Sequence, residues 1–121
     1  MIEGKNDVGK TTILNYVFDV LCSNGAAYIE DKKPLGSEPQ DFSCVIDYNG
    51  KKVAFFTMGD YSRKVSEAID KYNDCDYLIC ALNTDFASST IERIKNKCSD
   101  LTVIPMEKYA DISSDIFKAL M

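Results

Sequence analysis

The sequence predicts a three-layer α/β fold with a mostly parallel sheet, in which one strand of a β-hairpin runs antiparallel. Three observations carry this prediction. Apolar segments typical of strands alternate along the chain with segments of helical period. Asn49-Gly50 joins two β-rich segments, which is the strongest short-range signal of a hairpin. Residues 4–11 fit the phosphate-binding loop pattern G-x-x-x-x-G-K-[ST], between a short apolar segment and a helical one.

The first half of the chain supplies the first helix and the hairpin. Residues 1–3 predict the end of a strand that is short beside the usual five or six residues, or one truncated at the amino terminus. The apolar spacing in 12–21 predicts a helix that ends before Gly25, which suits a left-handed C′ position. Residues 26–29 predict a short strand and 30–41 a loop. The hairpin strands are expected at 42–48 and 51–57.

The second half alternates helices with buried strands. A helix is expected over 62–72 with Ser62 as its cap, and another begins at Ser88 or Ser89 and presents Cys98 inward. Continuous apolar segments at 76–82 and 101–105 predict strands buried on both faces. An amphipathic helix over 112–120 completes the chain. The loops that follow the parallel strands therefore share one edge of the sheet, where α/β proteins bind ligands.

Composition narrows the range of partners. The 121 residues indicate one domain, 1–121, and the net charge of −5 without a basic stripe argues against nucleic acid. No apolar segment is long enough to span a bilayer and no signal peptide is visible, so we expect no membrane partner and a cytoplasmic location. The five cysteines form no C-x-x-C pair and histidine is absent, which favours buried thiols over a zinc site.

The phosphate-loop pattern carries the chemistry of the functional prediction. Glycines at 4 and 9 let the backbone bend around an anion, so that the intervening N–H groups face phosphate oxygens. Lys10 would reach the β- and γ-phosphates as the catalytic cation, and the Thr11 hydroxyl would be a Mg²⁺ ligand. The helix that starts near Lys10 adds its positive dipole end. The expected nucleotide-binding residues are Gly4, Lys5, Asn6, Asp7, Val8, Gly9, Lys10, Thr11, Thr12 and Gly59.

Residues 4–15 resemble the first motif and following helix of the P-loop GTPases of the Ras-like and Era-like group. The order of elements, with the Asn-Gly hairpin followed by a helix and a buried strand, is similar over most of the chain. The resemblance implies a P-loop nucleotide-binding domain that binds ATP or GTP with Mg²⁺ as cofactor. It also implies Mg-dependent hydrolysis or switch behaviour.

Two later motifs of that group differ here. The metal-side motif D-x-x-G is replaced by Thr57-Met58-Gly59-Asp60, without an aspartate at the end of the strand. Gly59 would present its amide to the γ-phosphate, and Asp60 would hold the metal through water and act in catalysis. An equal alternative is that Asp60 is a solvated loop carboxylate or helix cap. The guanine-reading motif N-K-x-D is absent, and 106–111 occupies its place.

Two other P-loop groups resemble the same stretch. Residues 2–12 are similar to the loop of thymidylate-kinase-like enzymes, and 4–12 to the loop of ParA/MinD-type ATPases, where a lysine at the Lys5 position acts across a dimer. Three functions therefore stay open. They are a triphosphate-binding NTPase or switch, a phosphotransferase of the nucleoside-kinase kind, and a non-catalytic module that binds a protein partner or forms a homodimer.

Overall fold

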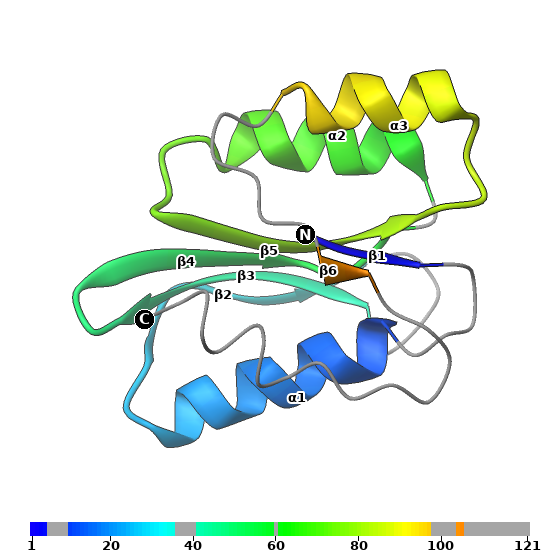
Figure 1. Ribbon diagram of the computed structural model, residues 1–121. Coiled ribbons are helices and arrows are strands. Elements are labelled where there is room, and N and C mark those ends of the chain that lie inside the picture. The colour runs from blue at the N-terminus through cyan, green and yellow to red at the C-terminus, as the bar shows by residue number, and fades with distance from the viewer. Residues whose placement is uncertain (5–9, 36–40, 60, 98–103, 106–121) are drawn as a thin grey trace.

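A mixed sheet with the strand order β2-β3-β4-β5-β1-β6 forms the middle of the molecule (Figure 1). The computed structural model describes residues 1–4, 10–35, 41–59, 61–97 and 104–105. The strands, in chain order, are β1 (Ile2–Gly4), β2 (Ala27–Pro34), β3 (Phe42–Tyr48), β4 (Lys51–Phe56), β5 (Tyr77–Asn83) and β6 (Ile104–Pro105). The helices are α1 (Lys10–Ser23), α2 (Ser62–Lys71) and α3 (Ser88–Lys95).

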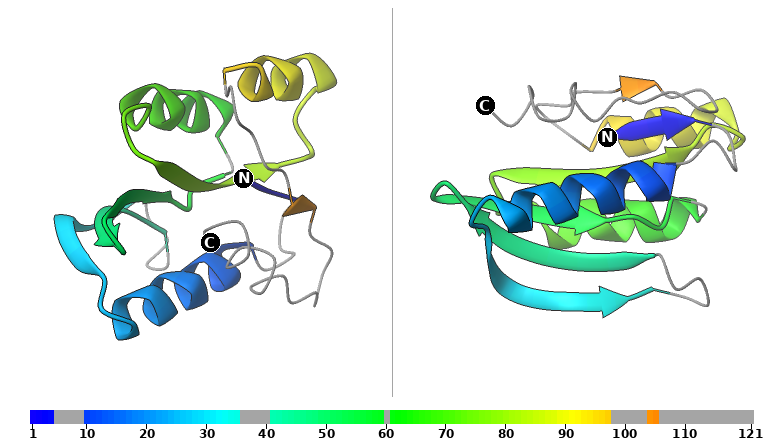
Figure 2. Two further views of the ribbon diagram at one scale, coloured as in Figure 1. Left: turned by 60° about the vertical axis from the view of Figure 1, so that its left-hand side comes forward. Right: turned by 90° about the horizontal axis from the view of Figure 1, so that it is seen from below.

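One strand runs against the others. β3 pairs antiparallel with both β2 and β4, whereas β5 pairs parallel with β4 and with β1, and β1 pairs parallel with β6. The α/β class and the reversed hairpin strand are therefore confirmed. Helix α1 covers one face of the sheet, and α2 with α3 covers the other (Figure 1). Seen from below, β2 and β6 lie at opposite edges (Figure 2).

The turn between β3 and β4 has the conformation that its two residues predict. Asn49 and Gly50 both have positive φ, at 54° and 78°. A two-residue hairpin turn needs this because its backbone twist then matches that of the strands. The Asp47 carboxylate accepts a 3.0 Å hydrogen bond from the Gly50 N–H and holds the turn. Gly25, at φ 96°, likewise takes the left-handed conformation expected after the first helix.

Aromatic side chains pack beneath α1. The Phe18 ring meets Phe42 and Phe55 edge to face, with centroids 5.0 and 5.4 Å apart. All three are buried because α1 places Phe18 over the strands that carry the other two. Edge-to-face pairs at this separation are favourable beyond the apolar area that they bury. This contact fixes α1, and therefore its first residue Lys10, against the hairpin.

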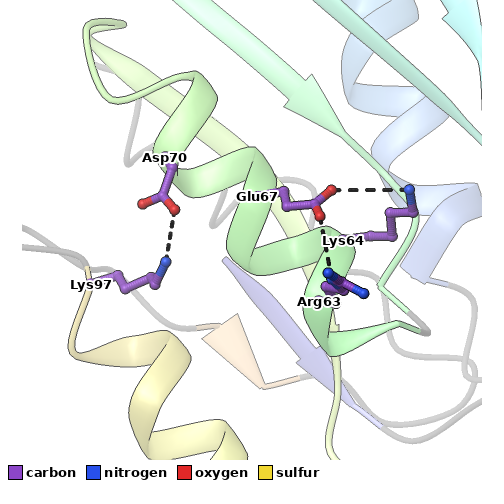
Figure 3. Close-up of polar contacts among 5 residues, drawn as sticks. All are labelled: Arg63, Lys64, Glu67, Asp70 and Lys97. Carbon is purple, nitrogen blue, oxygen red and sulfur yellow. Dashed lines mark hydrogen bonds and ion pairs between the residues drawn. The ribbon is translucent and has the colours of Figure 1, made fainter.

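A smaller core lies between the sheet and the other two helices. Val65 and Ile69 of α2 cluster with Leu82 of β5 and Ile94 of α3. On the surface, Lys97 just after α3 and Asp70 of α2 form an ion pair at 2.8 Å, which ties the two helices together (Figure 3). No helix in the described ranges is long and apolar enough to cross a membrane.

Three details of the sequence prediction are corrected, and others lie outside the described residues. β2 continues to Pro34, so the strand is longer and the loop shorter than expected. Residues 30–34, four charged residues and a proline, belong to the strand because the pairing with β3 extends through them at the exposed edge. Ser62 and Ser88 do not cap their helices. Tyr61 and Ala87 occupy the cap positions and make no side-chain cap bond. Cys98, residues 101–103 and the helix expected over 112–120 lie outside the described residues.

Candidate functional site

The segment that fits the phosphate-binding pattern begins at the end of β1. After β1 and after the neighbouring β5, the chain continues on opposite faces of the sheet. β1 and β5 are adjacent parallel strands. The helix after β1 lies on one face of the sheet, and the helix after β5 lies on the other (Figure 1). Such a divergence leaves room beyond the carboxyl ends of the two strands, where open α/β sheets bind ligands. The predicted phosphate loop therefore begins at the switch point of this sheet.

Backbone hydrogen bonds fix the strand ends on either side of β5. The Thr84 N–H donates to the Gly4 carbonyl at 3.0 Å, and the Asn83 N–H donates to the Gly59 carbonyl at 3.1 Å. The Asn83 side chain is buried and accepts a bond from the Asp85 N–H at 2.8 Å, which sets the turn after β5. The end of β5 thus holds the start of the phosphate loop and the loop after β4 in register.

Lys10 lies across the base of the phosphate loop. Its side chain is only 7% exposed, and Nζ donates to the Gly4 carbonyl at 2.9 Å. A buried ammonium is costly unless acceptors surround it. The two ends of the loop pattern are therefore joined by a buried cation at the amino end of α1, where the helix dipole is also positive. This combination is suited to an anion.

Asp41, which the sequence analysis did not select, supplies a carboxylate beside Thr11. The Thr11 hydroxyl donates to Asp41 Oδ1 at 3.3 Å, and the Thr57 hydroxyl donates to the same oxygen at 3.0 Å. Thr57 in turn accepts a bond from the Phe42 N–H at 2.9 Å. Asp41 and Thr57 are buried, so the carboxylate is held in one position by two hydroxyl donors.

Asp41, the residue before β3, thus places a carboxylate beside the end of β4, where the sequence has no aspartate. Because β3 runs antiparallel, its first residues meet the carboxyl ends of the parallel strands. The sequence contains a signal for this position. An aspartate that directly precedes an antiparallel hairpin strand lies beside the carboxyl ends of the parallel strands, where α/β sheets bind ligands. The prediction assigned residues 30–41 to a loop and gave Asp41 no role.

The pair of Thr11 hydroxyl and Asp41 carboxylate fits a magnesium ion better than a transition metal. Both are hard oxygen donors, and Mg²⁺ in proteins is usually held by one or two carboxylates together with waters and substrate phosphates. Within the described ranges, no three His, Cys, Asp or Glu side chains gather into a metal site. A Mg²⁺ ion here would therefore depend on phosphate oxygens for the rest of its coordination.

The remaining predicted site residues divide into three groups. Thr12 lies exposed on α1, next to Thr11. Gly59 is buried, and a Cβ added to it would lie 2.7 Å from the Ala81 backbone carbon, so close packing against β5 requires glycine here. Residues that lie outside the described part of the chain are Lys5, Asn6, Asp7, Val8, Gly9 and Asp60.

A cavity of about 520 Å³ opens beneath α2, beside the loop that carries Gly59. Its wall is mostly apolar and includes Phe56, Met58, Tyr61 and Tyr72. Arg63 at the start of α2 does not line it. The guanidinium is 90% exposed and forms a 3.6 Å ion pair with Glu67, which also pairs with Lys64 (Figure 3). The cavity was not predicted because its residues are dispersed over three elements.

No protein-family model, curated protein or solved structure matches this chain. The functional argument therefore depends on the sequence pattern and on the geometry described above.

Proposed function

We propose that this chain has a P-loop NTPase fold and binds a nucleoside triphosphate, ATP or GTP, with Mg²⁺ on the loop between β1 and α1. The observation that carries the proposal is the placement of the loop pattern. It starts at Gly4 on the switch point of the sheet, and its last residue but one is the buried Lys10, whose Nζ contacts the Gly4 carbonyl. The phosphate oxygens of a nucleotide in this loop would accept hydrogen bonds from the loop amides and from the Lys10 ammonium.

The residues present suit slow hydrolysis or switch behaviour. Lys10 would neutralise charge that develops on the terminal phosphate while water attacks it. Thr11 and Asp41 would hold Mg²⁺, which supplies further neutralisation between the β- and γ-phosphates when bound. The chain has two arginines, Arg63 and Arg93, and the first is ion-paired on the surface. We therefore expect weak intrinsic turnover, which a protein partner could raise by contributing a cation.

A thermal-shift panel tests binding directly. At about a hundred times its dissociation constant, a triphosphate adds roughly 2.7 kcal/mol to the free energy of unfolding. For a chain of this size the melting temperature should then rise by roughly 10 °C. The panel compares ATP, GTP and their diphosphates with and without Mg²⁺. Absence of any shift at millimolar nucleotide would contradict the proposal and favour the non-catalytic module.

A second function, transfer of the terminal phosphate to a small molecule, is favoured by one observation. The cavity beneath α2 reaches Met58 and Tyr61, which precede and follow Gly59-Asp60 in the chain, and its volume suits a small aromatic acceptor. Asp60 would then act as the base for the acceptor hydroxyl. Incubation with ATP and a panel of nucleosides distinguishes the two functions, since only the phosphotransferase forms a phosphorylated acceptor.

A further inference from the structure

The free edge of the sheet carries a charge pattern that matches a second copy of itself. In the part of the chain that the structure describes, β2 has β3 beside it and no strand on its other side. All eight residues of β2 are exposed. An edge strand of this kind presents N–H and C=O groups that another strand can pair with.

The sequence of this edge reads symmetrically when one copy is turned by 180° against the other. Residues 28–35 run apolar, apolar, acidic, acidic, basic, basic, apolar, apolar, namely Tyr28, Ile29, Glu30, Asp31, Lys32, Lys33, Pro34 and Leu35. In an antiparallel pair centred between Asp31 and Lys32, each residue faces the one whose number brings the sum to 63. Each acidic residue then faces a basic residue of the other copy, and each apolar residue faces an apolar one.

We propose that β2 pairs antiparallel with β2 of a second copy in this register and forms a two-fold dimer. Glu30 would face Lys33 of the other copy, and Asp31 would face Lys32 of the other copy. Opposite charges directly across an antiparallel pair stabilise it, and like charges destabilise it. Only one register gives four such pairs, so the pattern specifies both the partner and the alignment.

Apolar side chains at both ends of the strand support the same register. Tyr28 and Ile29 are 55% and 48% exposed, so both side chains have apolar surface that a second strand would cover. In the proposed pair they lie opposite Leu35 and Pro34 of the other copy. The arrangement is closed, because each copy uses its β2 edge once and leaves no second β2 edge for a third chain.

Lys32 contacts aromatic rings of its own chain. Its Nζ lies 4.4 Å from the centroid of the Phe42 ring and 4.9 Å from that of Phe18. To face Asp31 of a second copy, the Lys32 side chain would turn from these rings toward the free edge. The charged residues of β2 guard the edge against unrelated strands, and its two register irregularities, between Tyr28 and Glu30 and between Glu30 and Lys33, fall within the proposed pair. A second copy can pair with this edge because the order of the charges is complementary to itself.

Charge reversal on each half of the strand gives a decisive test in the full chain. An all-positive variant carries Glu30→Lys and Asp31→Lys, and an all-negative variant carries Lys32→Glu and Lys33→Glu. Each alone would place like charges opposite one another, whereas a mixture of the two restores four opposite pairs. Sedimentation velocity over a concentration series at low salt measures the association. Lys64→Glu with Lys71→Glu on α2 is the control with the same change of net charge as the all-negative variant.

We expect the unmodified chain and the α2 control to dimerise, and each charge-reversed variant to associate about tenfold or more weakly. The mixture should form a heterodimer, and added salt should weaken every dimer. Circular dichroism checks that each variant is folded, and the heterodimer is itself proof of folding. The proposal is overturned if the unmodified chain stays monomeric up to about 1 mM, the range of the weakest specific complexes. It is equally overturned if the variants dimerise as the unmodified chain does, or if mixing them restores nothing.

Discussion

The two regions of this sheet for which we propose functions use charge in opposite ways. At the carboxyl edge, Lys10 and Asp41 are buried and hydrogen-bonded to the backbone or to hydroxyl groups. Along β2, four charged residues are exposed, two acidic ones followed by two basic ones. Buried charges are costly and persist where the fold or a ligand compensates for them. Exposed charges cost little and can specify a partner. Substitutions should therefore have large, local effects at the first edge and small effects on stability at the second.

The largest effect is expected for Lys10→Met. It should weaken triphosphate binding by about a hundredfold, which corresponds to the loss of one charged hydrogen bond of roughly 3 kcal/mol. The fold should persist because the Gly4 carbonyl keeps its bond from the Thr84 N–H and Met fills the apolar part of the space. Isothermal titration calorimetry measures the affinity. Lys33→Met on β2 is the matched control, and equal weakening in both variants would contradict the assignment.

Gly59→Ala should destabilise the fold by about 1–3 kcal/mol, as expected when a methyl group is forced into a packed site. The new Cβ would lie 2.7 Å from the Ala81 carbon and 2.8 Å from its carbonyl oxygen, so backbone would have to move. Urea unfolding measures the loss. Gly50→Ala is a control of a different kind, because space there is open and only its positive φ opposes a side chain. An unchanged midpoint for Gly59→Ala would show that β5 does not approach this closely.

Asp41→Asn should reduce the contribution of Mg²⁺ to triphosphate binding by about tenfold, the lower range for groups that support a metal. The amide oxygen can still accept bonds from Thr11 and Thr57, so only the charge is removed. Binding without Mg²⁺ should be unchanged or improved, since a negative charge near phosphate is lost. Titrations with and without Mg²⁺ measure both values, with Asp19→Asn on the exposed side of α1 as the control. If Mg²⁺ dependence were the same in both variants, Asp41 would have no part in holding the metal.

Cys44 is a buried residue of β3, and its thiol should make the free energy of unfolding depend on pH. Burial raises the pKa of the Cys44 thiol from 9.0 to about 11. Between these values the unfolded chain loses the proton while the folded chain keeps it, so the free energy of unfolding falls as pH rises. Below about pH 8 the thiol should contribute no slope. Urea unfolding from pH 8 to 11 measures this, and Cys44→Ala should show a shallower fall. Parallel curves for the two proteins would refute the raised pKa.

The smallest effect is expected on the stability of the monomer when β2 charges are removed. Lys33→Ala and Glu30→Ala should each change the free energy of unfolding by less than about 0.5 kcal/mol, because both side chains are exposed. Thermal unfolding at micromolar concentration measures this below the range of any weak dimer. A loss above about 1 kcal/mol would mean that these side chains stabilise the single chain, and the contrast between the two edges would disappear.

The parts of the fold that local chemistry determines could be predicted from the sequence. The Asn49-Gly50 hairpin followed from two residues that tolerate positive φ, and Gly25 from the same property. The apolar spacing of α1 predicted its buried face, and the continuous apolar segment of β5 predicted burial on both faces. Helix caps failed at Ser62 and Ser88 because a cap depends on the approach of the preceding chain as well as on residue type.

Features that depend on contacts between residues distant in the sequence could not be predicted from short stretches of it. The second half of β2, residues 30–34, was predicted as a loop because charged residues and Pro34 are poor strand formers, yet pairing with β3 extends the strand to that proline. Asp41 was missed although the hairpin itself was predicted, since its importance appears only when the direction of β3 is combined with the position of Thr11. The cavity beneath α2 likewise combines residues from the sheet and a helix.

The most direct test of the central proposal is amide NMR of the full chain during titration with Mg²⁺ and a slowly hydrolysed analogue of ATP or of GTP. Loop amides that bind phosphate oxygens change their environment more than any others, so we predict saturable shifts concentrated in residues 4–11 for at least one nucleotide. Lys10→Met should move them to about a hundredfold higher nucleotide concentration. Absence of saturable shifts in 4–11 at millimolar concentrations of both analogues, or shifts confined to the cavity beneath α2, would contradict the account.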